Sequence, residues 1–171
     1  MRRITSLSKI LPSALALSAL AACATSGGRS SPSPAPDAGA PTPVANYDWH
    51  LNLEPQEAGL AYGVANSDEV KLQLRCATGS GALDLAAMLD KPSRQLHLES
   101  GGDTDRYPAV SEDAGITDGH YAQADAKTKD PVFQRFRRLG WIAVWDGETR
   151  RTYAAHPQSL ADIERFFVAC N

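Results

Sequence analysis

The chain has 171 residues, with 17 basic side chains against 20 acidic ones and a formal net charge of −3. This length suits one domain with additional segments and is short for two domains of ordinary size. Three of the 17 basic residues (Arg2, Arg3 and Lys9) lie within the first 22, so beyond residue 22 there remain 14 against 20, a net charge of −6. This acidic balance argues against a nucleic-acid-binding protein, which needs a basic surface.

The first 22 residues have the pattern of an export signal. Residues 1–9 are short and basic, residues 10–20 are mostly apolar, and small residues precede Cys23. The apolar run is too short to span a bilayer, which needs about 20 residues. The alternative interpretation is an ordinary signal peptide cut at an Ala-x-Ala site, which leaves Cys23 as a bystander.

The segment Leu20-Ala21-Ala22-Cys23 resembles the lipobox of bacterial lipoproteins, and the resemblance covers residues 1–23. It implies that diacylglycerol is attached to the sulfur of Cys23, that residues 1–22 are removed, and that a fatty acid such as palmitate acylates the new amino group. Two or three chains hold a protein firmly at a membrane, whereas one binds only marginally. Ala24 resembles the sorting pattern for the outer membrane, which would leave the protein facing the periplasm.

Residues 23–46 are predicted to be the lipidated cysteine followed by a disordered tether. Residues 24–46 hold five Pro, three Gly, four Ser and five Ala, and Val44 is their one large aliphatic side chain. Such a segment cannot bury enough apolar surface to offset its ordering entropy. In the extended polyproline form, 23 residues reach about 70 Å at most. The alternative is a proline motif that binds a partner.

From Tyr47 onward, short apolar alternations predict one β-rich globular domain over residues 47–171. The clearest strand covers residues 70–76, and a Thr-Gly-Ser-Gly turn at 78–81 leads into a strand whose Leu83, Leu85 and Ala87 face inward. The run at 141–145 is apolar on both faces, which predicts a strand covered on both sides. Further expected strands lie at residues 49–53, 96–98, 107–110, 119–124 and 150–155, the last after a hairpin turn at Asp146-Gly147.

Two short helices are predicted near the chain end. One begins at Pro131 after a capping Asp130, places Val132, Phe136 and Leu139 on its buried face, and ends at Gly140. The other opens with a capping-box-like pair, Ser159 and Asp162. Its buried face is predicted to consist of Leu160, Ile163, Phe167 and Cys170. The expected fold is therefore mainly β (α+β): a small curved antiparallel sheet or barrel with two short helices packed on it, one at the C-terminus.

The three cysteines support the export interpretation. If lipid occupies Cys23, Cys76 and Cys170 remain, both on faces predicted to be buried, and the periplasm is oxidising. A bridge between them would close a loop of about 95 residues and contribute about 4 to 5 kcal/mol. The alternative is two buried free thiols.

No residue is predicted to be catalytic, to bind a metal, or to hold a cofactor. Ser80 lacks the Gly-x-Ser-x-Gly spacing of a hydrolase nucleophile and is interpreted as a turn serine. His97 alternates with Leu96 and Leu98, which places it on the outer face of its strand. The four histidines (His50, His97, His120 and His156) lack metal-ligand spacing. The acidic stretch at Asp103, Asp105, Glu112, Asp113 and Asp118 is interpreted as a solvated loop rather than a calcium site.

One basic concentration is a candidate patch for anionic groups: Arg135, Arg137, Arg138, Arg150 and Arg151. In an envelope protein it would meet lipid headgroups, lipopolysaccharide or an anionic glycan. The alternative is that these arginines are the solvated outer face of a helix and its neighbouring strand.

Three functions remain open. The first is a membrane-anchored lipoprotein that presents a small non-catalytic binding or inhibitor domain. Its layout is similar to that of the lipoprotein-type lysozyme inhibitors: a lipobox, a small barrel, a bridge from an early strand to the chain end, and a Cys-x-x-Gly element at Cys76 to Gly79. None of that family's functional loop residues can be placed on this chain. The second is a structural or assembly factor that holds an envelope protein. The third is a hydrolase with a dispersed site such as His120 with Asp118.

Overall fold

The computed structural model describes residues 40–115 and 118–171, so Cys23, its signal segment and the tether up to residue 39 lie outside the described residues. The described chain forms nine strands and two helices. Their bounds are β1 (Tyr47–Leu53), β2 (Glu57–Val64), β3 (Val70–Ala77), β4 (Ala82–Leu89), β5 (Gln95–Ser100), β6 (Asp103–Asp113), β7 (His120–Lys127), α1 (Pro131–Leu139), β8 (Trp141–Asp146), β9 (Thr149–Ala154) and α2 (Leu160–Cys170).

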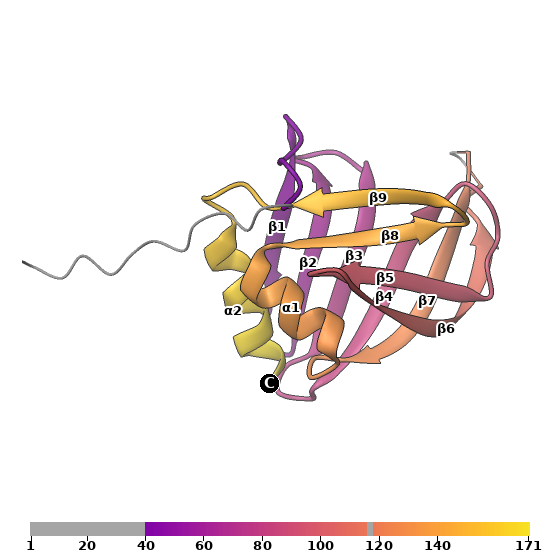
Figure 1. Ribbon diagram of the computed structural model, residues 1–171. Helices are drawn as coiled ribbons and strands as arrows, with labels where there is room; N and C mark the ends of the chain where they lie inside the picture. The colour runs from indigo at the N-terminus through magenta and orange to yellow at the C-terminus, as the bar shows by residue number, and fades with distance from the viewer. Residues whose placement is uncertain (1–39, 116–117) are drawn as a thin grey trace, which may run out of the picture. The chain divides into compact units, whose positions relative to one another are not determined.

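All strand pairs are antiparallel, and the nine strands form one sheet in the order β1-β2-β3-β4-β7-β6-β5-β8-β9. The sheet curls into a nearly closed barrel, with β8 and β9 crossing the direction of β1 to β3 at a steep angle (Figure 1). The predicted mainly-β fold with two short helices, one at the C-terminus, is confirmed. The strand at residues 57–64 was not predicted.

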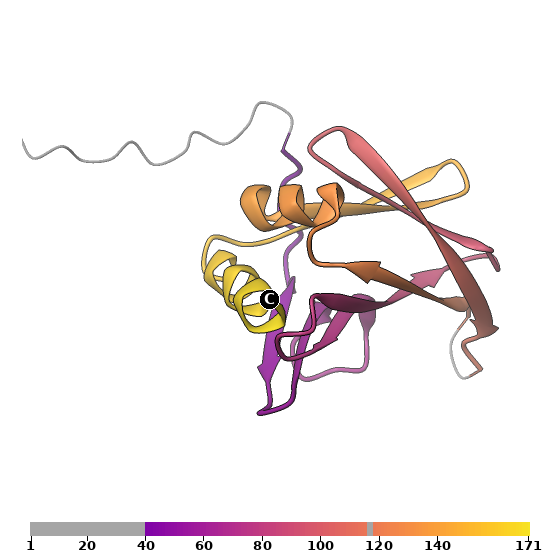
Figure 2. The same cartoon turned by 90° about the horizontal axis from the view of Figure 1, so that it is seen from below.

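The two helices lie beside each other and cover one side of the barrel (Figure 2). Helix α1 packs on β5, β6 and β8, and α2 packs on β1 and β2. The buried aromatic side chains of α1 are Phe133 and Phe136, and those of α2 are Phe166 and Phe167. The prediction that Leu160 is buried is wrong: at the first position of α2, this side chain contacts Gly140 at the end of α1 but stays 45% exposed.

The helix ends differ in part from the prediction. Pro131 occupies the first turn of α1, and Gly140 ends the helix in the left-handed conformation, as expected. The carboxylate of Asp130, however, makes no cap and instead accepts the N–H of Lys127 at 2.9 Å. The capping box predicted at Ser159 is also wrong, since this side chain makes no cap bond and its hydroxyl donates to the carboxylate of Asp48.

The acidic stretch that was predicted to be a loop is largely strand. Asp103, Asp105, Glu112 and Asp113 belong to β6, whose register with β5 and β7 runs from Asp103 to Asp113. One of these carboxylates serves α1: Asp105 accepts the N–H of Val132 at 3.0 Å and so satisfies an amide of the first helical turn. Asp105 therefore has a structural use, and Asp103 forms an ion pair with Arg135 of α1.

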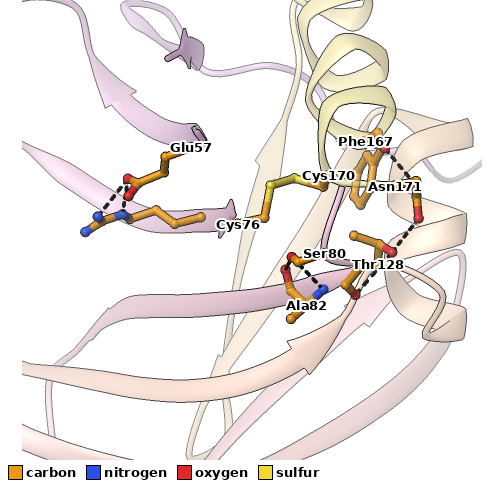
Figure 3. The surroundings of a disulfide bond; sticks show 10 residues. Glu57, Cys76, Ser80, Ala82, Thr128, Phe167, Cys170 and Asn171 are labelled. Atoms are coloured by element: carbon orange, nitrogen blue, oxygen red, sulfur yellow. Dashed lines mark hydrogen bonds and ion pairs between the residues drawn. A yellow bond between two sulfur atoms is a disulfide. The ribbon is translucent and has the colours of Figure 1, made fainter. Parts of the chain in front are cut away.

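A disulfide joins Cys76, at the end of β3, to Cys170, at the end of α2 (Figure 3). The two Cα atoms lie 5.7 Å apart, and both side chains are buried. Next to it, the N–H groups of Gly79 and Gly81 donate to the carbonyls of Ala169 and Cys170 at 2.9 and 2.8 Å. The turn between β3 and β4 thus satisfies the last carbonyls of α2, which would otherwise lack partners.

Candidate functional site: the barrel mouth

A pocket of about 510 Å³ opens between β9 and the end of the barrel at which β1 begins and β2 ends. We call it the mouth pocket. It is lined by Val44, Tyr47, Tyr62, Lys71, Met88, Asp90, Asp118, Arg151, Thr152 and Tyr153. Concave sites of this size, with apolar walls and a few polar groups, are where small ligands and side chains bind in barrels.

Three tyrosines from three strands form the apolar wall of the mouth pocket. The ring of Tyr62 lies 5.8 Å from that of Tyr47 and 4.8 Å from that of Tyr153, between centroids. Below them, Trp49 lies 5.4 Å from Tyr62 and 4.7 Å from Phe136 of α1. An unbroken series of aromatic contacts therefore connects the pocket with the helices, and it holds the tyrosine rings in fixed positions.

A β-bulge turns Lys71 toward the pocket. The register of β2 with β3 shifts between Tyr62 and Gly63, which pair with Leu72 and Val70, so Lys71 is the extra residue. A bulge re-aims side chains at the rim of a barrel. The bulge needs a glycine on the facing strand, since a Cβ at Gly63 would lie 2.3 Å from the carbonyl oxygen of Glu69.

Ion pairs form the rim of the mouth pocket. The ammonium of Lys71 lies 2.9 Å from the carboxylate of Glu69, which also accepts the hydroxyl of Tyr47. On the opposite side, Arg151 pairs with Asp90 and lies 3.2 Å from Asp146. The rim thus carries charges of both signs over an aromatic interior.

The hydroxyl oxygen of Tyr62 is buried and has no hydrogen-bond partner among the described residues. The Tyr62 side chain is 2% exposed, and its burial raises its pKa, as does the nearby charge of Asp48. Burial also raises the pKa of Tyr153 to about 12. Both hydroxyls therefore stay protonated at neutral pH, and that of Tyr62 can both donate and accept a hydrogen bond. A buried polar group without a partner costs about 1 to 3 kcal/mol.

The structure separates the five arginines of the predicted patch. Arg151 faces the mouth pocket, whereas Arg150 lies on the outer face of β9. Arg138 is exposed on α1 and has no carboxylate at ion-pair distance within residues 40–115 and 118–171. The other four are held in ion pairs: Arg135 with Asp103, Arg137 with Glu164, Arg150 with Glu99, and Arg151 with Asp90 and Asp146.

The histidines lie apart from the mouth pocket. His97 is on the outer face of β5, as predicted, and its ring stacks on Trp145 with the centroids 5.8 Å apart. Burial lowers the pKa of His97, and the charge of Arg106 lowers it further. Asp118 lines the pocket, but none of the four histidines does. In the part of the chain that the structure describes, no group of three His, Cys, Asp or Glu side chains is placed to hold a metal.

The mouth pocket was not among the sites predicted from the sequence. Its tyrosines at 47, 62 and 153 are far apart in the chain, and Lys71 enters only through the bulge. One available signal was the alternation of Ala58, Leu60 and Tyr62, which places a tyrosine on the inner face of an otherwise small-residue strand.

Of the helices within the described residues, neither has the length and apolar character to cross a membrane. Comparison of the chain with protein-family models, with curated proteins and with solved structures finds no match in any of the three.

Proposed function

We propose that the protein is an envelope lipoprotein that is anchored through lipid on Cys23. It presents a non-catalytic binding domain, whose ligand site is the mouth pocket. The observation that carries the binding assignment is the mouth pocket itself, in which the rings of Tyr47, Tyr62 and Tyr153 form an aromatic wall beneath a charged rim. The lipobox-like segment at residues 20–23 supports the anchor, with Ala24 favouring an outer membrane location that faces the periplasm.

The composition of the pocket favours binding over catalysis. Its two basic side chains are engaged in ion pairs: Lys71 with Glu69, and Arg151 with Asp90. A hydrolase would need a nucleophile within hydrogen-bond reach of a base. Aromatic walls and fixed ion pairs instead suit recognition of an apolar group with a polar margin.

The inhibitor form of this proposal has one named partner. The strand-to-terminus bridge between Cys76 and Cys170 agrees with the layout that resembles lipoprotein-type lysozyme inhibitors. Adding the purified protein to cells under lysozyme treatment should slow lysis if lysozyme is the partner. Unchanged lysis would remove lysozyme and leave the binding site to be tested with other envelope components.

Photo-crosslinking in cells tests the ligand site. Benzoylphenylalanine replaces Met88, which lines the pocket, or Val168, which is 62% exposed on α2, in the full-length protein. The proposal expects a discrete crosslinked species from position 88 that is absent from position 168. Crosslinks from position 168 alone would place the partner surface on α2 and contradict the mouth as the site.

Lipid labelling tests the anchor independently. Cells fed a labelled fatty acid should label the wild-type protein, whereas Cys23→Ser should stay unlabelled and retain residues 1–22. Equal labelling of the two proteins would contradict the anchor without bearing on the mouth pocket.

A further inference from the structure

The ladder between β8 and β9 determines which backbone N–H and C=O groups of β9 form hydrogen bonds to β8. Just past the strand, the N–H of Ala155 donates to the carbonyl of Gly140 at 2.8 Å. Hydrogen-bonded pairs recur at every second position of an antiparallel ladder. In the register of this ladder, the hydrogen-bonded positions of β9 are therefore Tyr153, Arg151 and Thr149.

The backbone groups of Arg150 and Thr152 therefore point away from β8. β9 is the last strand in the sheet order, so no strand within the described residues pairs with this edge. Arg150 is exposed and Thr152 is half-buried, and Thr152 lines the mouth pocket. The edge thus presents two N–H donors and two carbonyl acceptors beside the opening of the pocket.

Side chains and backbone of β1 contact β9 beyond this open stretch. The indole N–H of Trp49 lies 3.4 Å from the carbonyl of Tyr153, a carbonyl that faces the β8 ladder. The backbone N–H of His156, just after β9, donates to Asp48 of β1 at 3.1 Å. The Asp48 side chain therefore joins β1 to the chain just after β9, and the edge is open at residues 150–152.

We propose that the ligand of the mouth pocket is an extended peptide segment of a partner protein, which adds as a strand to the open edge of β9. This inference rests on the proposed function and names the ligand class of the same site. Its backbone pairs with the groups of Arg150 and Thr152, and the side chain opposite Arg151 enters the pocket. Strand addition takes affinity from the backbone bonds and specificity from alternate side chains.

The direction of that side chain follows from the pleat of the sheet. Arg151 points inward and lines the pocket, and a residue directly opposite it on a neighbouring strand points to the same face. At this position the pair lacks backbone hydrogen bonds, so the side chains approach more closely. The rings of Tyr62 and Tyr153 then favour a large aromatic side chain that packs against them.

The probe is a displayed library of linear heptapeptides, selected against the full lipoprotein in detergent. We expect selected peptides with one aromatic side chain that is required for binding. N-methylation of the amides next to that residue, which would face Arg150 or Thr152, should weaken binding at least tenfold. N-methylation of the amide of the aromatic residue itself should change affinity less than twofold. Along the peptide, residues whose N-methylation weakens binding should therefore alternate with residues whose side-chain truncation weakens binding.

Two variants separate the strand from the pocket. Thr152→Pro removes an edge N–H without touching the ladder to β8 and should weaken peptide binding tenfold or more, whereas the control Val168→Ala, exposed on α2, should bind within twofold of the wild type. Tyr47→Ala opens the pocket wall and should also weaken binding. Loss with Tyr47→Ala but not with Thr152→Pro would overturn strand addition and leave the mouth pocket as the site.

The other outcomes are equally decisive. Loss with Thr152→Pro but not with Tyr47→Ala would contradict the pocket and with it the proposed function. Selection of no peptide would overturn the inference, as would a concentration-dependent dimer that Thr152→Pro dissociates, because a second copy would then occupy the edge. The N-methylated peptides keep the test valid with wild-type protein if Thr152→Pro fails to fold.

Discussion

The indole N–H of Trp49 on β1 lies 3.4 Å from the carbonyl oxygen of Tyr153 on β9, so a side chain joins the two end strands where a ladder would close the barrel. A complete ladder would remove both sheet edges. Here the seam is closed only in part, and the mouth pocket lies where it stays open. The incomplete closure therefore accounts for both the pocket and the unpaired edge of β9.

Asp48 should be the most sensitive polar residue of the seam. Its carboxylate accepts the N–H groups of Trp49 and His156 at 2.9 and 3.1 Å, and the hydroxyl of Ser159. Hydrogen bonds to a charged group contribute about 1.5 to 3 kcal/mol. Asp48→Ala should therefore lower the free energy of unfolding in urea by about 2 to 3 kcal/mol. Asp84→Ala, on the exposed face of β4, serves as control and should change it by less than about 0.5 kcal/mol.

The disulfide should dominate the stability of the domain. Cys76 and Cys170 are 94 positions apart, and closing such a loop contributes about 4 to 5 kcal/mol in the chain-entropy model. Urea unfolding with and without dithiothreitol should differ by that amount in the wild type. In the double variant Cys76→Ser, Cys170→Ser, the reductant should have no effect. An equal response of the two proteins to reductant would contradict the pairing.

Two glycines of β2 provide a matched pair for the bulge. A Cβ at Gly63 would meet the carbonyl of Glu69 at 2.3 Å, whereas one at Gly59 would meet nothing within 4 Å. Gly63→Ala should cost about 1 to 3 kcal/mol of stability, as overpacking does, and should weaken ligand binding by displacing Lys71. Gly59→Ala should leave both measurements close to wild type. Similar effects from the two substitutions would show that the bulge does not position the pocket.

Glu99 should make stability depend on acid pH. The guanidinium of Arg150 donates two hydrogen bonds to it at 2.8 and 2.7 Å and lowers its pKa below 4.5, as does the indole of Trp145 to a smaller extent. Because the pKa is lowered in the folded state, the stabilisation is complete above the unfolded pKa and is lost as pH falls through the folded pKa.

The corresponding measurement is urea unfolding from pH 6 to pH 2.5. The wild type should lose stability below about pH 4.5. In Glu99→Gln this loss should be smaller, with lower stability at neutral pH, whereas Glu112→Gln, exposed on β6, should follow the wild-type curve. A Glu99→Gln profile parallel to the wild type would rule out this pair as the cause.

Regular alternation made much of the fold predictable. The inward positions of β3 and β4, from Leu72 to Ala87, follow period two because one face is buried along the whole strand. Strand β2 lacked this contrast, since Gly59, Ala61 and Gly63 are small rather than polar. The buried face of α2 was predicted to begin at Leu160. It begins instead at Ile163, since Leu160 is the first residue of the helix and precedes the part that packs on the core.

The mouth pocket depends on relations that a single sequence does not display. Tyr47, Tyr62 and Tyr153 come together only through the strand order and the approach of β9 to β1. Lys71 faces the pocket because of a register shift. This shift requires a glycine at position 63, where the backbone carbonyl of Glu69 approaches closely. Long-range register of this kind is set by the pairing of whole strands rather than by local propensity.

The most direct test of the central proposal uses the methionine content of the chain. The sequence has two methionines, Met1 and Met88, and Met88 lines the mouth pocket. The proposed cleavage before Cys23 would remove Met1, so the mature protein labelled with ¹³C-methyl methionine should give one methyl resonance. Adding the partner identified by crosslinking should shift or broaden that resonance, and Tyr47→Ala should abolish the effect. A methyl resonance that stays unchanged at saturating partner would contradict the mouth pocket as the ligand site.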